Sequence, residues 1–362
     1  MTGRLSMPRY RELLDAVLAG ETVPVCPVFA HQHHPAADQD GGRLAEATLA
    51  WQARFDVDLV KLTPASTWQL RDYGVEDAPD PADPLGRRRI TRTVVADAGD
   101  WLRLPRLDPA RGFAARILRA AALVRKALPG VPVVATVYAP ASQAAKLAGA
   151  KRLADHSRTA PQALAAGLDV ITENTVRTIA ALAQTGIDGI FLAVQNAGKA
   201  SFTAAEYAGF GSPGDRACLA AAQSLPLNIL HLHGDGVHHG LFRDCAPALL
   251  HLEASPGNPA PESLLAQGGL ATGPSPWGAL AAGRPGDVRR EAASLLARLK
   301  GPRFVLAPGC TLPLSVTAAA LDAMIAAART PRPNAPPELT SGAGRSQVRE
   351  SGRQSRRPDL ET

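Results

Sequence analysis

Short apolar runs recur along the chain and alternate with longer stretches in which apolar residues step by three or four positions. The runs are rich in Val, Ile and Leu and are four to seven residues long, which is typical of buried strands. Eight runs are predicted to form strands, at residues 23–29, 59–62, 131–137, 189–194, 227–233, 248–252, 269–273 and 303–307.

The stretches between most of these runs have the period of an amphipathic helix. One set of stepping positions comprises Leu164, Leu168, Ile171, Thr175, Ile179 and Leu182, and a second comprises Phe113, Ile117, Ala121, Val124 and Leu128. A further helix over residues 10–18 ends before Gly20, because glycine readily adopts the left-handed conformation that stops a helix. We expect this first helix to plug or flank the bottom of the fold.

Alternating strands and helices with near-continuous apolar strands predict a parallel sheet that is buried on both faces. Eight strand–helix units match a (β/α)8 TIM barrel, and such barrels of about 250 residues or more form one domain. We therefore predict an α/β protein with a single (β/α)8 TIM barrel over residues 1–330.

Two segments depart from the strand–helix alternation. Residues 91–95 and 101–104 flank the turn Ala98-Gly99-Asp100, which predicts a small β-hairpin inserted between the second and third barrel strands. Residues 331–362 are rich in Pro, Ser and Arg and have no apolar period, which predicts a disordered C-terminal tail.

The composition, with 46% hydrophobic and 20% charged residues, is typical of a globular protein. The net charge is +6, but the segment 331–362 holds six arginines against four acids, so the folded part offers little to attract nucleic acid. No long uncharged apolar stretch and no signal-peptide pattern are present, so we expect a cytoplasmic protein with no membrane partner. Four scattered cysteines favour free thiols or a metal ligand over disulfides.

Reactive side chains of a barrel enzyme lie where strands end and the following loops begin. Polar residues occupy several of these ends and are predicted to line the pocket of a small-molecule substrate. The predicted substrate-binding residues are His31, His33, Lys61, Tyr138, Gln195 and Glu253.

Two histidines end the fifth predicted strand, and a cysteine follows the eighth. Residues two apart on a strand point to the same side, so His231 and His233 are predicted to face the barrel axis together. With Cys310 as a third ligand they match a catalytic zinc site, which has three protein ligands and one open position. The alternative is that the histidines form structural hydrogen bonds and Cys310 is a small buried apolar residue.

At these residues the chain resembles the uroporphyrinogen decarboxylase superfamily over about residues 7 to 330. The resemblance is carried by Ile229-Leu-His231-Leu-His233-Gly-Asp235, Gly273-Pro-Ser-Pro-Trp277, Phe304-Val-Leu-Ala-Pro-Gly309-Cys310-Thr-Leu-Pro313 and Phe191-Leu-Ala-Val-Gln195 with Glu206-Tyr-Ala-Gly-Phe210. The superfamily includes decarboxylases and zinc-dependent methyltransferases that move methyl groups between a corrinoid protein and a thiol. The resemblance implies a TIM barrel and one of these two chemistries.

The chain differs from the decarboxylases at three strand ends. Those enzymes grip carboxylates with arginines after the first strand, where this chain has histidines including His31 and His33. They place an Asp after the second strand, where this chain has Lys61, and a Tyr where Lys146 falls. A lysine at this end should favour anionic ligands, unless Asp58 or Asp72 pairs with it.

Cys310 in Gly309-Cys310 resembles the methyltransferases, so catalysis is expected to rest on zinc held by His231, His233 and Cys310. The expected reaction moves a methyl group from a corrinoid to a thiol, with a corrinoid protein as the expected partner. A decarboxylase acting on uroporphyrinogen or a related tetrapyrrole and a non-catalytic corrinoid- or tetrapyrrole-binding module are the alternatives. The resemblance also allows a homodimer.

Overall fold

A curled parallel sheet forms the centre of the molecule in the computed structural model, which describes residues 8–332. The sheet order is β1-β4-β5-β6-β7-β8-β9, and neighbouring strands in it are parallel. The strands are β1 (Val60–Leu62), β4 (Val133–Tyr138), β5 (Gly189–Val194), β6 (Ile229–Leu232), β7 (Leu249–His251), β8 (Leu270–Thr272) and β9 (Phe304–Leu306).

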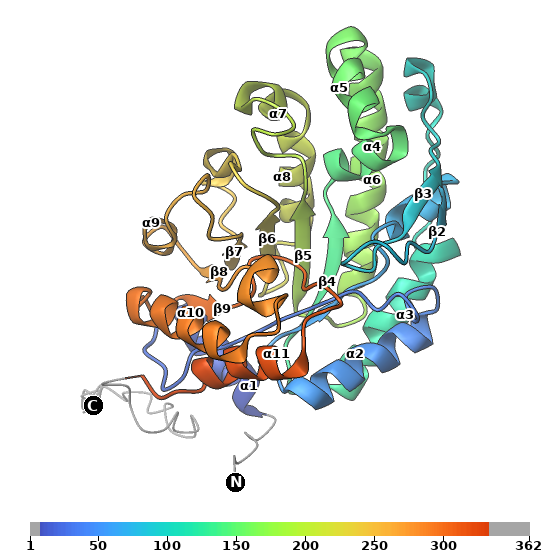
Figure 1. Cartoon of the computed structure of the whole chain (residues 1–362). Coiled ribbons are helices and arrows are strands. Elements are labelled where there is room, and N and C mark those ends of the chain that lie inside the picture. Colours follow the sequence, from blue (N-terminus) through green and yellow to red (C-terminus); the bar gives the residue numbers. More distant parts are fainter. Residues whose placement is uncertain (1–7, 333–362) are drawn as a thin grey trace, which may run out of the picture.

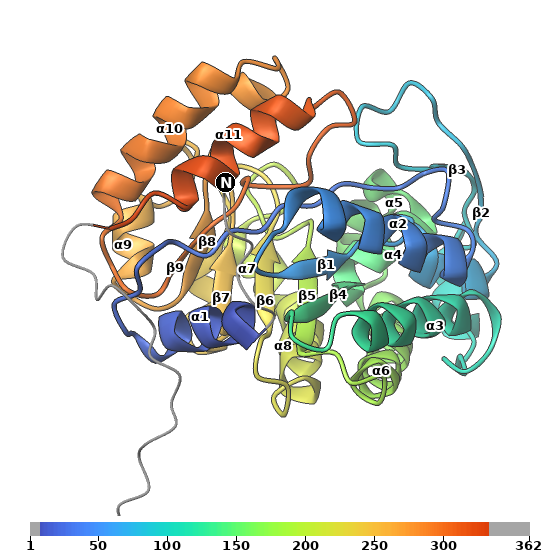
Figure 2. The same ribbon diagram turned by 90° about the horizontal axis from the view of Figure 1, so that it is seen from below.

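Helices surround this sheet on its outer side, as Figures 1 and 2 show. The α-helices are α1 (Pro8–Ala19), α2 (Gly41–Phe55), α3 (Gly112–Ala127), α4 (Pro140–Ala148), α5 (Ala150–Thr159), α6 (Pro161–Ala183), α7 (Ala204–Phe210), α8 (Ser212–Ala221), α9 (Pro261–Leu265), α10 (Pro285–Arg298) and α11 (Ala318–Ala328). Shorter helical turns are η1 (Trp68–Tyr73), η2 (Ala98–Arg103), η3 (His239–Phe242) and the π-helical η4 (Pro276–Leu280). No helix among residues 8–332 is long and apolar enough to span a membrane.

The apolar periods identified in the sequence form the core. Every residue of β4 and β5 is buried, as expected for a parallel sheet with side chains packed on both faces. The stepping positions of α6 from Leu164 to Leu182 are all buried, which confirms the predicted helix face. In α1, Leu13, Leu14 and Val17 are buried and Gly20 follows with φ +83°, so the first helix is confirmed as well.

The first predicted strand, residues 23–29, is not a regular strand, and the prediction of eight strands is wrong in this respect. Val28 forms only an isolated parallel bridge with Leu306. Pro24 and Pro27 have no backbone N–H and cannot donate to a ladder, which explains why the pairing stays short. The segment still bonds to both neighbours, because Phe29 N donates to Leu306 O at 3.1 Å and Asp58 N donates to Val28 O at 2.8 Å.

The predicted hairpin at residues 91–104 is also wrong in position. The antiparallel pair is β2 (Glu76–Ala78) with β3 (Arg89–Arg92), at the periphery of the molecule in both views. The segment taken as its second strand is η2, whose first turn closes because the Asp100 carboxylate accepts hydrogen bonds from the backbone N–H groups of Ala96 and Asp97. Trp101 in η2 is fully buried and donates to Nδ1 of His156.

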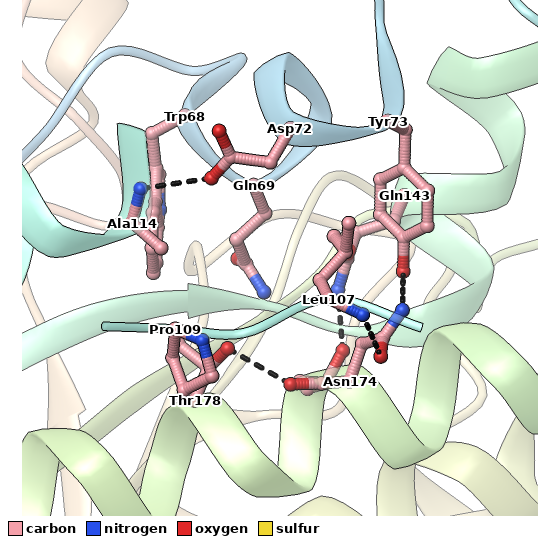
Figure 3. A pocket seen from close by; sticks show the side chains of 11 residues that line it. Trp68, Gln69, Asp72, Tyr73, Leu107, Pro109, Ala114, Gln143, Asn174 and Thr178 are labelled. Atoms are coloured by element: carbon pink, nitrogen blue, oxygen red, sulfur yellow. Dashed lines mark hydrogen bonds between the residues drawn. The ribbon is translucent and has the colours of Figure 1, made fainter. Parts of the chain in front are cut away.

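A small buried cavity lies between η1, α3 and α6 (Figure 3). Its volume of about 20 Å³ suits one water molecule and no substrate. Hydrogen bonds cross its wall: Asp72 accepts from the first N–H groups of α3, including that of Ala114, and Asn174 accepts from Leu107 N at 2.9 Å. The cavity therefore belongs to the packing of the helices.

A buried carboxylate joins three distant segments at the start of β1. Asp58 accepts from Val28 N at 2.7 Å and from the Arg329 guanidinium at 2.6 Å. These bonds tie the first segment of the chain and the end of α11 to the sheet. The predicted tail, residues 331–362, lies outside the described residues from 333 onward.

We predict that Asp58→Ala lowers the free energy of unfolding by about 3 kcal/mol, because Arg329 and Val28 N then lose a buried acceptor. Urea denaturation, monitored by circular dichroism, measures the loss. The control is Asp322→Ala, which breaks an exposed pair with Arg54 and should cost less than about 1 kcal/mol. Equal losses in the two variants would contradict the structural role of Asp58.

Candidate active site

The residues predicted to bind metal come together where β6 and β9 end. His231 lies in β6 and His233 follows it directly, while Cys310 lies four residues beyond the end of β9. The Cys310 Sγ is 3.3 Å from His233 Nδ1 and 3.7 Å from His231 Nε2. All three potential ligand atoms lie within 4.8 Å of one another, so one metal ion could contact them all.

The tautomer of His231 suits a ligand role. Its Nδ1 is 3.2 Å from the carbonyl oxygen of His251, which only accepts hydrogen bonds. The proton therefore resides on Nδ1, and the Nε2 lone pair faces Cys310. Burial lowers the pKa of His231, and the charges of His251, His233 and Lys61 act in the same direction. The imidazole is therefore neutral, as metal binding requires.

Close backbone packing positions Cys310. A Cβ at Gly309 would lie 2.7 Å from Cα of Glu253, so only glycine lets the loop approach β7 this closely. On the other side of the cysteine, Leu312 N donates to His31 O at 3.0 Å, and His31 Nε2 lies 3.2 Å from Thr311 Oγ1. The loop is thus anchored on both sides. Burial raises the pKa of the Cys310 thiol.

Lys61 is buried beside this cluster and has no carboxylate partner among residues 8–332. Its Nζ lies 4.5 Å from the centre of the Phe191 ring and 3.3 Å from Thr63 Oγ1. Asp58 and Asp72, the pairing alternatives considered from the sequence, are engaged by Arg329 and by the N-terminus of α3. Burial lowers the pKa of Lys61 to about 7.

A second lysine, Lys146 in α4, lies against Tyr138. Its Nζ is 3.9 Å from the centre of the Tyr138 ring and donates to Ser66 O at 3.0 Å. Burial lowers the pKa of Lys146 to about 7 and raises that of Tyr138. Two glutamines hold the Tyr138 backbone in place: Gln69 accepts from its N–H at 2.6 Å, and Gln143 donates to its carbonyl at 2.8 Å.

Arg87 adds a third cation, from the loop between β2 and β3. The loop is fastened by the Arg87–Asp83 ion pair and by a bond from Leu314 N to Pro84 O at 2.8 Å. The positive charge of Arg87 helps to lower the pKa of His233 and of Lys146, so it lies near both.

His33 is buried among these cations. Burial lowers its pKa to about 3, and the charges of Lys61, Lys146 and Arg87 act in the same direction. The structure thus groups Lys61, Tyr138 and His33 with two cations that were not predicted as site residues.

The two remaining predicted substrate-binding residues differ in their distance from the candidate metal ligands. Glu253 follows β7, accepts from Ser275 Oγ at 2.7 Å, and is close enough for its charge to raise the pKa of Cys310 and of His233. Gln195 follows β5 and is half-buried, and its backbone N–H donates to Ser142 Oγ. Among the described residues no hydrogen bond joins its side chain to the cluster.

Sequence reasoning missed Arg87, Lys146 and His251 as parts of the site. The sequence named Lys146 only as the position where the decarboxylases have a Tyr and not as a site residue; it lies in α4, which starts directly after β4. Arg87 lies in an insertion without a periodic pattern. His251 lies within a predicted apolar strand, where the pattern indicates a core residue. Nothing in the local sequence marks either of them.

Comparisons with known proteins agree with this fold. The family model described as uroporphyrinogen decarboxylase (URO-D) matches residues 18–331. A solved structure described as a methyltransferase from Methanosarcina mazei is similar with a TM-score of 0.75 and 21% identity, covering 87% of this chain and 96% of that one. A B12-independent methionine synthase from Shewanella sp. W3-18-1, solved in complex with selenomethionine, is similar with a TM-score of 0.54 and 12% identity, covering 85% and 97%. None of the curated proteins matches the sequence.

We predict that Lys61→Met raises the free energy of unfolding of metal-free protein at pH 7 by roughly 2–4 kcal/mol, because each unit of pKa displacement corresponds to about 1.4 kcal/mol. The folded-state pKa of about 7 is below the ordinary value of 10.5. Between these values the unfolded chain binds more protons, so the wild type gains stability as pH rises and the difference from the variant shrinks.

Urea denaturation from pH 7 to pH 10 in the presence of a chelator measures this dependence. The control is Lys126→Met on the exposed face of α3, which should change stability by less than about 0.5 kcal/mol at every pH. If Lys61→Met behaves like the control, the ammonium is solvated and the site is open to water.

Proposed function

The chain belongs to the uroporphyrinogen decarboxylase family, and we propose that it is a zinc-dependent methyltransferase that moves a methyl group from a corrinoid to a thiol. The observation that carries the proposal is the convergence of His231, His233 and Cys310 at the strand ends. A methyltransferase among the similar structures is consistent with the reaction class.

The donor set fits zinc. Ligand distances of about 2.3 Å to sulfur and 2.1 Å to nitrogen in a tetrahedral site place sulfur and nitrogen about 3.6 Å apart. The Cys310 Sγ lies 3.7 Å and 3.3 Å from the two histidine nitrogens, which is close to that separation. Zinc in this place would supply a Lewis acid that lowers the pKa of a substrate thiol, so that the thiol is ionised at neutral pH.

The side chains around the metal ligands would bind and orient the thiol substrate. Lys61, Lys146 and Arg87 present positive charge, and neither lysine pairs with a carboxylate in the described part of the chain, so the site favours a substrate with an anionic group. The negative charge of Glu253 acts to raise the pKa of both His233 and Cys310, and we propose that this carboxylate takes the proton that the thiol releases.

The low-dielectric surroundings also have a role. His33, His231 and Lys61 are all buried, so water is excluded from much of the site wall. A desolvated sulfur nucleophile reacts faster with a methyl donor than a hydrated one. We propose that a partner corrinoid protein presents the methylated corrinoid to the site.

We predict about one zinc ion per chain in protein purified without chelator. Cys310→Ala should weaken zinc binding by more than about 100-fold, because a direct ligand is lost, and should change the stability of metal-free protein by less than about 1 kcal/mol. Metal analysis and chelator competition measure the first effect, and urea denaturation measures the second.

The matched control is Cys26→Ala. Cys26 is also buried, but its Sγ lies against the carbonyls of Pro27 and Phe304. This variant should keep its zinc. A metal-free wild type that zinc addition leaves unchanged would refute the zinc site, and an unfolded Cys310→Ala would assign that cysteine to the core.

Decarboxylation of uroporphyrinogen is the second candidate, because the matching family model carries that description. Lys61 argues against it, since an ammonium there repels the partial positive charge of pyrrole N–H groups, and Asp72 is used to cap α3.

We predict that the wild type does not decarboxylate uroporphyrinogen III. Any decarboxylation should be gained only in Lys61→Asp, which restores a carboxylate at this strand end. Chromatography of the porphyrin products measures the reaction. Brisk decarboxylation by the wild type would replace the methyltransferase proposal.

A further inference from the structure

His251 lies between the two parts of the chain that carry the candidate metal ligands. It is the last residue of β7, is fully buried, and pairs in register with His231 of β6. The two imidazole rings are 4.7 Å apart between centroids. On its other side β7 pairs with β8, which in turn pairs with β9, the strand that leads to Cys310.

Two hydrogen bonds connect His251 to these segments. Its carbonyl oxygen faces Nδ1 of His231 at 3.2 Å, and its side-chain Nε2 lies 2.8 Å from the carbonyl oxygen of Pro308. A carbonyl only accepts, so Nε2 of His251 carries the proton. Pro308 is two residues before Cys310, and its position limits where the Cys310 sulfur can lie.

Burial of the polar His251 ring lowers the free energy of unfolding. Burial lowers the pKa of His251 to about 4, so the ring is neutral at pH 7. Its Nδ1 has no hydrogen-bond partner among residues 8–332. A buried polar atom without a partner costs about 1–3 kcal/mol, which a Met or Leu side chain at this position would avoid. An apolar side chain at this position could not donate the hydrogen bond to Pro308 O.

The remaining bonds of the Cys310 loop do not replace this contact. Gly309 N donates to Pro274 O at 3.3 Å, which is long for a backbone hydrogen bond. The bond from Leu312 N to His31 O holds the loop beyond the cysteine. His251 therefore provides the short contact before it.

We propose that His251 is a positioning residue that sets the separation between the His231 nitrogen and the Cys310 sulfur. The main chain of His251 orients the first ligand and its side chain holds the loop of the second. The inference rests on the metal site of the proposed function and assigns His251 no contact with the substrate. Partners that orient metal ligands commonly change metal affinity by about 10–100-fold when they are lost.

The test compares His251→Gln with His251→Met, two side chains of equal length. Gln places an N–H donor near the position of Nε2, and Met places a methyl group there. We expect His251→Met to bind zinc about 10–100-fold more weakly in chelator competition and His251→Gln to stay within about threefold of the wild type. The sulfur-to-metal charge-transfer band of the cobalt(II)-substituted protein should weaken or shift in His251→Met and persist in His251→Gln.

Folding stability separates positioning from a structural role. Met suits an apolar interior, so His251→Met should unfold at the same urea concentration as the wild type or a higher one. Thr136→Val is the control, because it removes a buried hydrogen bond from Thr136 Oγ1 to Leu62 O at 2.7 Å elsewhere in the sheet. It should keep the metal affinity of the wild type even if it loses stability.

Each outcome decides the inference. Zinc affinity and cobalt spectrum of His251→Met equal to those of the wild type would overturn the role of His251 while leaving the metal site standing. A wild type that binds neither zinc nor cobalt would overturn both. Weaker binding in both His251→Met and His251→Gln would also overturn the proposal, because the donor would then have no effect.

Discussion

Parallel pairing of the strands is the constraint on which the site depends. Because β1 and β4 to β9 run in one direction, their carboxyl ends meet at one edge of the sheet, and residues far apart in sequence become neighbours there. Cys310 lies 79 positions after His231 in the chain, yet its sulfur is 3.7 Å from that imidazole. The apolar strands fix this arrangement by burying both faces of the sheet. The packing of the core therefore determines where the side chains of the site lie.

The charge distribution at this edge differs from that of the rest of the protein. Elsewhere arginines pair with acids, as Arg71 and Arg88 do with Asp77 and Arg329 does with Asp58. Lys61 and Lys146 instead rest on aromatic rings, and burial lowers the pKa of each to about 7. Buried cations without a counter-ion cost folding free energy, and such a cost is common where a site is built for an anionic ligand.

The site is held by contacts outside the reacting groups. The inserted β2–β3 loop brings Arg87 to the strand ends and bonds to the segment after Cys310 through Pro84 and Leu314. Gly309 permits close packing on Glu253, and the ring of His251 bonds to Pro308. A metal or substrate site needs such support, because small displacements of its ligands cost affinity.

The sequence by itself determined the elements and the residues with reactive side chains. Hydrophobic period alone predicted seven strands of the parallel sheet and the buried face of α6, because burial acts residue by residue along a regular element. The spacing of His231 and His233 placed both on one side of a strand for the same local reason. Local pattern failed in two segments: Pro24 and Pro27 limited the first strand although both are visible in the sequence, and the hairpin formed at Glu76–Ala78 and Arg89–Arg92. Only the tertiary structure decided that Lys61 has no acid partner within residues 8–332, that Arg87 and Lys146 join it, and that His251 links the segments that carry His231 and Cys310. These facts depend on which strand ends and loops become neighbours, which no local pattern in the sequence contains.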